Sequence, residues 1–375
     1  KEITVGNETA SYNSIKGRYE IKVDNELSSY DIIAKSTDDL ANITLGIKAG
    51  DVTKVGTVEA TENKSGKETI VPITVTAQNG IESSTYDLAI IEKSSIANIG
   101  TVQVNGQEIE PDENGNYTAN VKSTITDAQI KVESQNDNAK VTVDNQTQDT
   151  NQLTIKRKIT EDKTEYTIKV VSEDGKNTEE KILTVNRLSG NTNISGIKVE
   201  TEDKKEYVPT VQEDGTYYVK TKRTGTANIT ITSEDEKAKI SIAGGEKNVG
   251  NNTSTVTLLD EITEVNILIE AEDGTTKAEI LKIEKESNNT DIAEIKGKDI
   301  KKVSKITSSK YEVQVDDRLQ TLTFDAITKN ENAKIKLGTE DEYTPNKIEN
   351  KSIDISQINS FTIDVLAEDG ETTKT

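Results

Sequence analysis

A short polar turn that ends in glycine recurs four times along this chain of 375 residues, at intervals of just under 100 residues. Each copy follows a stretch in which apolar and polar residues alternate, and the first three copies precede another such stretch. A period of two places every second side chain on one face of a β-strand, so each turn predicts a β-hairpin whose glycine has positive φ. Hairpins at a fixed period predict an array of similar domains. The four turns are Gln78-Asn79-Gly80, Glu173-Asp174-Gly175, Glu272-Asp273-Gly274 and Glu368-Asp369-Gly370.

Two further features recur in phase with the hairpins. A strand that begins at a tyrosine precedes each hairpin glycine by about 60 residues, and an Ala-x-Val or Ala-x-Ile strand lies between them in the later copies. The period predicts an all-β chain of four tandem Ig-like β-sandwich domains in an extended array, at 1–94, 95–189, 190–287 and 288–375. The tyrosines are Tyr19, Tyr117, Tyr217 and Tyr311, and the later strands begin at Ala139, Ala238 and Ala333.

Composition agrees with thin sandwiches and excludes several kinds of partner. Only 31% of residues are hydrophobic and mean hydropathy is −0.66, but the apolar residues alternate in phase, which favours folded strands over a disordered chain. With 67 acidic against 46 basic residues the chain should repel nucleic acid and anionic membrane surfaces. No apolar run is long enough to span a membrane, so we expect no membrane insertion. The absence of cysteine excludes disulfides and thiol chemistry.

In the first unit, alternation predicts strands at Ile3 and Val5, at Ile21 and Val23, and at Ile43 and Leu45, the last after a polar corner at 36–39. The joints between units are short, at 92–95, 188–192 and 286–290, and none is rich in proline or glycine. Short joints between compact domains favour an extended string with limited bending.

The fourth unit ends just after its hairpin turn, where the other three units continue into a closing strand. A sandwich without that strand exposes a sheet edge. Two explanations remain open: the natural chain continues, which we prefer, or another subunit supplies the strand in trans.

These features together resemble the bacterial cadherin-like β-sandwich domain, a family found in tandem in cell-surface proteins. The resemblance rests on an opening such as 193–199, a Tyr-x-Val strand start, an Ala-x-Val middle strand and the Ala-Glu-Asp-Gly hairpin. The family's closing strand commonly begins with tyrosine and ends near arginine; Tyr86 and Arg187 fit, whereas Lys181 and Glu279 replace the tyrosine. The resemblance implies a non-catalytic module of an extracellular protein, often associated with the wall or surface layer of a Gram-positive bacterium.

Calcium is the first site hypothesis, since acidic residues are abundant. The joints around Ser94-Ser95 and Leu188-Ser189-Gly190 carry almost no carboxylates in sequence, and we interpret the acidic turns 173–175 and 234–236 as solvated turns. We assign no metal-binding, cofactor-binding or catalytic residue and no cofactor, and structural calcium stays an alternative.

Other chemistries have less support. A Lys–Asn isopeptide bond needs an inward lysine at a matching position, but alternating lysines such as Lys169 and Lys220 are predicted on the solvent face. Sugar binding needs exposed aromatic rings, and the loop tyrosines neither cluster nor recur. With no histidine and no cysteine, the chain is not expected to be an enzyme. The loop tyrosines are Tyr12, Tyr30, Tyr207 and Tyr343.

The sequence therefore predicts a structural stalk on a bacterial cell surface, one that projects a distal domain of a longer protein. Its units should unfold nearly independently, since each has its own core. Two alternatives stay open: an adhesin module that binds a host protein, a glycan or the cell wall, and a subunit of an extracellular filament or layer assembled through open sheet edges.

Overall fold

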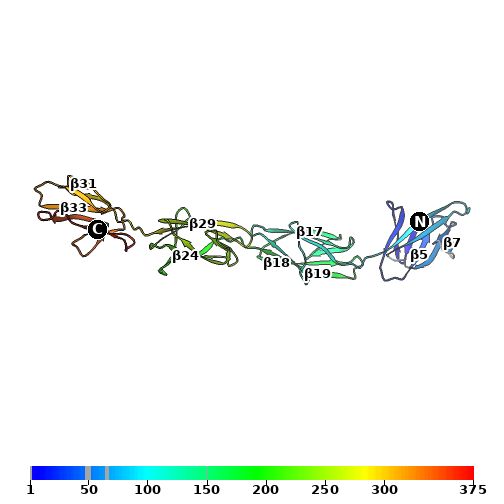
Figure 1. The fold of residues 1–375 in the computed structure, drawn as a ribbon. Coiled ribbons are helices and arrows are strands. Elements are labelled where there is room, and N and C mark those ends of the chain that lie inside the picture. The colour runs from blue at the N-terminus through cyan, green and yellow to red at the C-terminus, as the bar shows by residue number, and fades with distance from the viewer. Residues whose placement is uncertain (1, 47–51, 64–66, 149) are drawn as a thin grey trace. The chain divides into compact units, whose positions relative to one another are not determined.

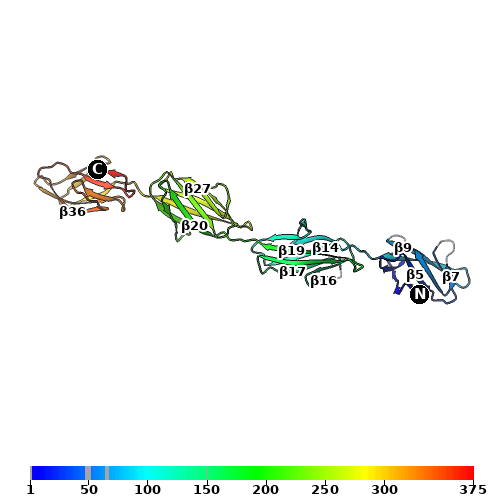
Figure 2. The ribbon, with the colours of Figure 1, turned by 90° about the horizontal axis from the view of Figure 1, so that it is seen from below.

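The structure is a computed structural model that describes residues 2–46, 52–63, 67–148 and 150–375. All of its described regular elements are β-strands, as Figures 1 and 2 show. Contacts divide the chain into two compact units, Lys1–Leu188 and Ser189–Thr375. The described residues build four hydrophobic clusters, two in each unit, and each cluster lies between sheets. We call the strand groups around them sandwiches 1 to 4, and the all-β sandwich architecture predicted from the sequence is confirmed.

Sandwich 1 packs a sheet of order β2-β1-β5-β8 against one of order β3-β4-β10-β9-β6-β7. The predicted strands at Ile3, Ile21 and Ile43 are confirmed, and these side chains are buried in its core. Its strands are β1 (Glu2–Val5), β2 (Glu8–Thr9), β3 (Ser11–Asn13), β4 (Arg18–Val23), β5 (Ser29–Lys35), β6 (Asn42–Leu45), β7 (Val52–Val55), β8 (Thr57–Asn63), β9 (Glu68–Thr76) and β10 (Ser83–Glu92).

Sandwich 2 repeats the plan with sheets β12-β11-β14-β17 and β13-β19-β18-β15-β16. Strands β14 and β17 pair antiparallel in the first of these sheets, and Figure 2 labels both in this sandwich. Its strands are β11 (Ile99–Val104), β12 (Gln107–Glu108), β13 (Tyr117–Val121), β14 (Asp127–Ser134), β15 (Lys140–Val143), β16 (Gln146–Gln148), β17 (Gln152–Lys158), β18 (Lys163–Val171) and β19 (Thr178–Arg187).

Sandwich 3 has sheets β21-β20-β24-β27 and β22-β23-β29-β28-β25-β26. Its strands are β20 (Ile194–Thr201), β21 (Glu206–Tyr207), β22 (Thr210–Val211), β23 (Tyr217–Thr221), β24 (Thr226–Ser233), β25 (Lys239–Ile242), β26 (Asn248–Val249), β27 (Asn251–Thr257), β28 (Ile262–Glu270) and β29 (Thr276–Lys285).

The closing strand is the element that joins each complete sandwich. Strands β10, β19 and β29 each pair antiparallel with the preceding hairpin strand and parallel with the strand that begins near the recurring tyrosine. Each is ten residues long and carries two fully buried aliphatic side chains two residues apart. The two faces of such a strand, one apolar and one polar, follow directly from the period-two pattern.

Sandwich 4 differs at this position. Its only strand after the hairpin is β38, two residues long, so β32 and β37 are not joined and lie in separate sheets among the described residues. The sheets are β30-β33-β36, β31-β32 and β35-β34-β37-β38. Its strands are β30 (Ile292–Lys296), β31 (Lys302–Lys305), β32 (Tyr311–Gln314), β33 (Thr321–Thr328), β34 (Lys334–Leu337), β35 (Thr344–Pro345), β36 (Lys347–Asp354), β37 (Ile363–Leu366) and β38 (Thr373–Lys374).

The hairpin glycines have the predicted backbone conformation. Their φ angles are 69° at Gly80, 74° at Gly175, 84° at Gly274 and 70° at Gly370. In this left-handed region a side chain meets its own backbone, which is why each turn ends in glycine.

Replacing Gly274 by alanine should therefore destabilise sandwich 3 by about 1 kcal/mol through backbone strain alone, because a Cβ there would meet no atom within 4 Å. Gly196→Ala is the matched control, since that residue has no positive φ and is equally open. Denaturant unfolding of the two variants checks the difference. Equal effects would show that the turn conformation is not what requires glycine.

Strand β5 of sandwich 1 was not predicted from the sequence, and the prediction that Tyr30 lies in a loop is wrong. Tyr30 lies in β5 with 2% of its surface exposed, and its hydroxyl donates to Glu92 Oε1 at 3.3 Å. The division between the two units lies one residue before the boundary predicted between the second and third domains; the other predicted boundaries remain predictions.

Candidate functional site

A serine between consecutive sandwiches donates its backbone N–H to the glutamate of the following hairpin. The N···Oε2 distances are 3.0 Å from Ser94 to Glu173, 3.2 Å from Ser189 to Glu272, and 3.0 Å from Ser287 to Glu368. The three contacts join residues about 80 positions apart in the chain, so they repeat in space as well as in sequence. We call each arrangement a junction clasp.

The clasp is reciprocal, because the next residue of the hairpin bonds the same serine. The backbone N–H of Asp174, Asp273 and Asp369 donates to the carbonyl oxygen of the serine at 3.0–3.2 Å. The aspartate carboxylate is occupied elsewhere: it accepts the N–H two residues later and so holds the turn. Aspartate therefore shapes the hairpin, and glutamate reaches the junction.

The residue before the serine is tied to the preceding sandwich. Lys93 N–H donates to Val23 O at 2.8 Å, and Glu286 N–H donates to Thr221 O at 2.8 Å. In both places, therefore, one residue is hydrogen-bonded to the preceding sandwich and the very next residue is hydrogen-bonded to the following sandwich. Leu188 N–H likewise donates to Val121 O within the first unit. At the Lys93–Ser94 and Glu286–Ser287 steps, no unbonded spacer residue is left to act as a hinge.

Ion pairs reinforce two of the clasps. Lys22 on β4 pairs with Glu173 at 2.5 Å, and Lys220 on β23 pairs with Glu368 at 2.7 Å. Both glutamates have only 11% of their side-chain surface exposed, so these pairs are less screened than surface pairs. The position three residues after the recurring tyrosine holds Lys22 and Lys220 but Asn120 in sandwich 2, where the amide bonds Asn186.

The first clasp has further support at its edge. Lys176, in the hairpin of sandwich 2, pairs with Glu26 of sandwich 1 at 2.7 Å, and the Asn177 side chain donates to Ser95 O at 2.8 Å. The Glu26 side chain is exposed, so its ion pair with Lys176 contributes little to stability by itself.

The electrostatics of the last clasp favour the ionised pair. Burial opposes ionisation of Glu368, but the Lys220 ammonium and the Ser287 N–H together hold the pKa of its carboxyl below its ordinary value. Burial likewise opposes the charge on Lys220, yet Glu368 and Glu284 raise the pKa of its ammonium well above its ordinary value. The clasp is therefore charged at neutral pH.

The lowered pKa of Glu368 predicts that the clasp stops stabilising the protein at acidic pH. Because the folded pKa of Glu368 lies below its ordinary value of 4.5, its stabilising contribution is complete above pH 4.5 and is lost as pH falls through the folded value. The non-titrating variant Glu368→Gln is the reference. The difference in unfolding free energy between the natural chain and this variant should be constant near neutrality and should shrink at pH 3. A difference that grows on acidification would contradict the assigned pKa.

These contacts correct three interpretations from the sequence. The joints do have carboxylates, but hairpins distant in sequence supply them. Glu173 is a bonded junction residue and not part of a solvated turn. Lys220 does not point freely to solvent, since it bonds Glu284 and Glu368. The missed signal was the serine that lies five residues before the isoleucine that begins β11, β20 and β30, at Ser94, Ser189 and Ser287.

The prediction that Tyr12 and Tyr207 lie in loops is wrong, because both lie in strands, whereas Tyr343 lies outside the strands. Tyr12 lies in β3, is 55% exposed and packs on Tyr19 with ring centroids 5.1 Å apart. Tyr207 lies in β21 and its hydroxyl accepts the N–H of Lys222. The Lys336 ammonium lies 5.0 Å from the ring centre of Tyr343. Tyr12, Tyr207 and Tyr343 belong to sandwiches 1, 3 and 4.

The acidic groups and the buried lysine of the described residues bear on the metal and isopeptide hypotheses. No group of three or more acidic side chains there could hold a metal ion, and the same ranges contain no helix that could cross a membrane. Lys285 is a buried lysine that sequence reasoning missed, and its ammonium donates to the carbonyl oxygens of Leu258 and Leu259. Its bonds are to backbone carbonyls and not to an asparagine side chain.

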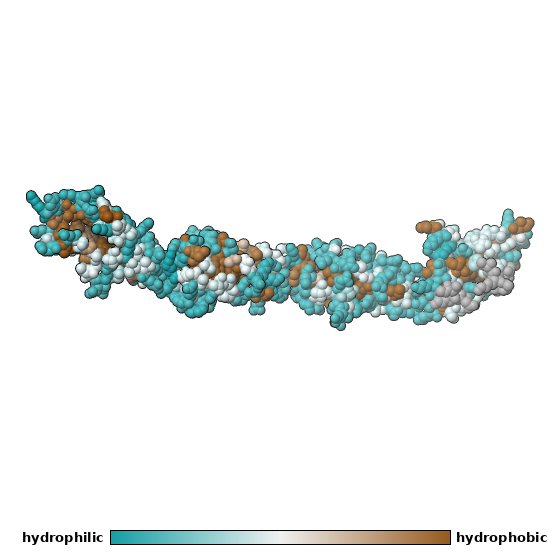
Figure 3. Space-filling view, viewed as in Figure 1, coloured by the Kyte–Doolittle hydropathy of each residue, from teal (hydrophilic) through white to brown (hydrophobic). Residues whose placement is uncertain are grey.

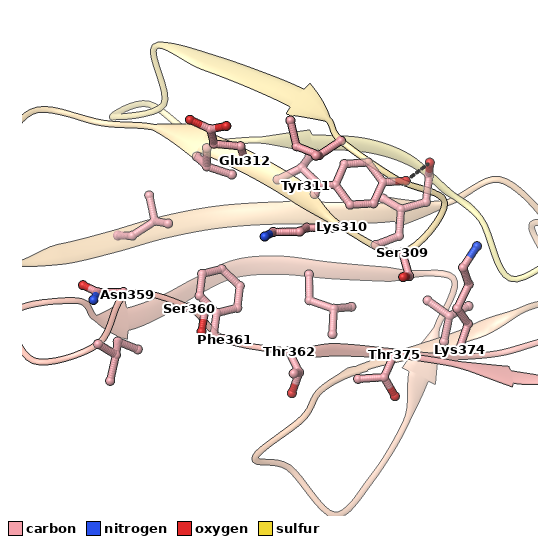
Figure 4. A pocket seen from close by; sticks show the side chains of 18 of the residues that line it. Ser309, Lys310, Tyr311, Glu312, Asn359, Ser360, Phe361, Thr362, Lys374 and Thr375 are labelled. Atoms are coloured by element: carbon pink, nitrogen blue, oxygen red, sulfur yellow. Dashed lines mark hydrogen bonds between the residues drawn. The ribbon is translucent and has the colours of Figure 1, made fainter.

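Sandwich 4 holds a second candidate site, a cavity of about 780 Å³ between β32 and β37 that is lined by both apolar and polar side chains. We call it the sandwich 4 cavity. Figure 3 shows hydrophobic side chains gathered in a hollow on this sandwich, and Figure 4 shows Tyr311 and Phe361 on the two segments that flank it. Tyr311 donates weakly to Ile292 O at 3.4 Å, and Phe361 packs on Phe324. Its apolar lining includes Ile292, Ile295, Tyr311, Val313, Val315, Leu322, Phe361, Ile363 and Val365.

Comparison with known proteins identifies the fold of one repeat. Residues 97–188 match the family model described as the cadherin-like beta sandwich domain. Sandwich 2 is a cadherin-like β-sandwich domain. The resemblance inferred from the hairpin and strand motifs is thereby confirmed for this repeat, and the sheets of sandwiches 1 and 3 follow closely related orders. No curated protein matches the chain.

Solved structures of tandem domains are similar to the chain at low identity. A four-domain ectodomain fragment of ICAM-5 is 10% identical, with a TM-score of 0.37, 99% of this chain covered and 96% of that one. The titin I67–I69 variant is 9% identical, with a TM-score of 0.32 and coverage of 72% and 95%. Domains 3–5 of Drosophila OTK are 10% identical, with a TM-score of 0.31 and coverage of 72% and 95%.

Proposed function

We propose that the chain is a non-catalytic spacer of a bacterial cell-surface protein, which holds other domains of a longer protein away from the cell. Tandem Ig-like and cadherin-like domains are typical of extracellular stalk and adhesion proteins, and a cadherin-like domain is present here. The observation that carries the proposal is the junction clasp. A spacer must resist bending at its joints, and a clasp with no unbonded residue supplies that resistance.

The clasp limits bending for a physical reason. Rotation about the Lys93–Ser94 step would break the backbone bonds on both sides of it and separate Lys22 from Glu173. Hydrogen bonds to a charged partner each contribute about 1.5–3 kcal/mol. Bent states at this joint are therefore rare at equilibrium, because several such contacts must open together.

Distance measurement between sandwiches 1 and 2 tests the proposal. The chain has no cysteine, so Glu59→Cys and Thr154→Cys give two unique sites for spin labels, both on exposed strand positions. We expect a narrow distance distribution by pulsed electron paramagnetic resonance. Adding Lys22→Ala and Glu173→Ala should broaden it, because both the ion pair and the acceptor of the Ser94 N–H are removed.

Lys131→Ala is the matched control, since Lys131 pairs with Glu133 inside sandwich 2. This variant also loses one ion pair, but it leaves the junction intact, so its distribution should stay narrow. A natural chain whose distribution is as broad as that of the clasp variant would contradict the spacer function.

A further inference from the structure

Strand β27 of sandwich 3, labelled in Figure 2, is an edge strand with one free side. It is the last strand of its sheet, and among the described residues it pairs with β24 alone. At the start of β27, Ser233 N–H donates to Gly250 O, and just after its end Leu258 N–H donates to Gly225 O. The even-numbered residues between these bonds therefore form the hydrogen-bonded pairs with β24. The odd-numbered residues direct their backbone N–H and C=O groups to the free edge. They are Asn251, Thr253, Thr255 and Thr257, and all four side chains are exposed.

Strand β27 lacks the charges that protect the equivalent edges of the other sandwiches. Strands β8, β17 and β36 hold the same last place in their sheets, and each carries at least two charged residues. The seven residues of β27 read Asn-Asn-Thr-Ser-Thr-Val-Thr, without a charge or a proline. Proteins commonly use charges, proline or very short strands to keep an exposed edge from pairing with another strand. The edge of β27 is therefore open to such pairing. The charged residues of the other edges are Glu59 and Glu62 on β8, Lys156, Arg157 and Lys158 on β17, and Lys347, Glu349, Lys351 and Asp354 on β36.

The outer face beside this edge is uncharged and held in place. Three consecutive cross-strand hydrogen bonds link threonine and asparagine side chains of β24 and β27. Because these side chains are already ordered, a strand that covers the edge costs them little further conformational entropy. The bonds are Asn251 Nδ2 to Thr232 Oγ1 at 3.0 Å, Thr230 Oγ1 with Thr253 Oγ1 at 2.9 Å, and Thr255 Oγ1 to Asn228 Oδ1 at 2.6 Å.

The charge of the chain and the register of β27 favour a second copy as the partner. Copies with a net charge of −21 repel one another over most of their surface, but β27 contributes no charge to that repulsion. Antiparallel pairing about a two-fold axis at Ser254 places all seven residues opposite residues of the same strand. Thr253 then lies opposite Thr255 of the second copy, and the free backbone groups of both residues face each other. Threonine pairs across strands are favourable, and no like charges meet.

We propose that β27 pairs antiparallel with β27 of a second copy of the chain, with the two-fold axis at Ser254. The outward backbone groups of the odd-numbered residues make the hydrogen bonds between the copies, which join the two small sheets of sandwich 3 into one continuous sheet. An interface of one strand from each copy is smaller than the roughly 1,000 Å² of a stable interface, so the pairing is reversible and forms where copies are concentrated. This proposal is independent of the spacer function, because it concerns sandwich 3 alone.

A single cysteine at the axis tests both the pairing and its register on the full chain. The two copies of Ser254 form a non-hydrogen-bonded pair, whose Cα atoms lie about 4.5 Å apart, so Ser254→Cys places two thiols within reach of a disulfide. Thr257→Cys is the matched control, because its two copies lie six residues apart along the paired strands, about 20 Å. Thr257 is also the more exposed of the two side chains, so poorer access cannot explain slower cross-linking of this control.

With oxidised glutathione as the oxidant, Ser254→Cys should form disulfide-linked dimers roughly tenfold faster than Thr257→Cys, because pairing raises the local thiol concentration at the axis only. Equal rates would overturn the proposal and leave the β27 edge to a strand of another protein.

Charged substitutions on the edge test whether β27 itself makes the contact. Adding Thr253→Lys and Thr255→Lys to Ser254→Cys places like charges opposite each other between the copies, so cross-linking should slow about tenfold. The matched control adds Thr276→Lys and Ala278→Lys, which bring the same two charges to exposed positions on β29, in the other sheet. This control should cross-link as fast as Ser254→Cys alone. Equal slowing by the two pairs of substitutions would overturn the proposal.

Ionic strength separates β27 pairing from association through ion pairs. Because β27 is uncharged, the faster cross-linking of Ser254→Cys over Thr257→Cys should persist at about 1 M salt, where charges on the surface are screened. A preference that disappears at this salt concentration would mean that ion pairs hold the copies together, and it would overturn pairing through the backbone of β27.

Discussion

Replacing Glu368 by alanine is expected to destabilise the second unit by about 3 kcal/mol, because a mostly buried charge pair loses one partner. The Glu368 carboxylate accepts from the Ser287 N–H, the Lys220 ammonium and the amides of Asn330 and Asn332. All four donors lose an acceptor in the variant. Denaturant unfolding of the full chain measures the change, and the transitions of residues 1–188 should not move.

Two variants separate the parts of this effect. Glu368→Gln keeps an acceptor for the Ser287 N–H but loses the charge, so its cost should be intermediate. Glu349→Ala is the surface control, because the Lys347–Glu349 pair is exposed at 47% and 61% and should contribute less than about 1 kcal/mol. If Glu368→Ala and Glu349→Ala lower the unfolding free energy by the same amount, the clasp does not stabilise the second unit.

Lys220→Ala completes a double-mutant cycle with Glu368→Ala. Residues in direct contact couple by about 0.5–3 kcal/mol, so the double variant should be less destabilised than the sum of the single ones. Lys220 also pairs with Glu284 of its own sandwich, and that pair persists when Glu368 is removed. A coupling energy near zero would mean that Lys220 stabilises the protein only through contacts within sandwich 3, such as its pair with Glu284.

The fold was predictable where local chemistry decides it. Positive φ at Gly80, Gly175, Gly274 and Gly370 follows from the turn sequence, and strict alternation identified most core strands. Strand β5 was missed because Ile33, on the outward face, interrupts the alternation of Tyr30, Ile32 and Ala34. Strand β8 was missed because its residues are mostly polar, although Val58 within it is fully buried.

The junction clasps were not predictable from local patterns. The serine and the glutamate that bond each other are about 80 residues apart, and neither residue type is unusual in its own turn. The hairpin at 78–80 has Gln78 and Asn79 where the other three hairpins have glutamate and aspartate. It is the one hairpin of the four with no junction serine bonded to it in the described ranges. Glutamate at the other three therefore reflects a contact beyond the turn.

Replacing Leu183 by alanine should destabilise sandwich 2 by about 2–5 kcal/mol, since it removes a fully buried side chain and leaves a cavity. Leu183 lies in the closing strand between Tyr117 on β13 and Tyr166 on β18, so both sheet neighbours lose contacts. Leu27→Ala is the control: that side chain is 50% exposed, and its loss should change the unfolding free energy by less than about 0.5 kcal/mol.

Scanning calorimetry of the Leu183→Ala chain also tests how far the loss spreads. Separate cores predict that the transition of sandwich 2 falls and that the transitions of residues 189–375 stay in place. The clasp between Ser94 and Glu173 belongs to sandwich 2 on one side, so sandwich 1 should lose only the energy of that clasp when sandwich 2 unfolds. A single transition that shifts as a whole would mean that the sandwiches unfold as one cooperative body.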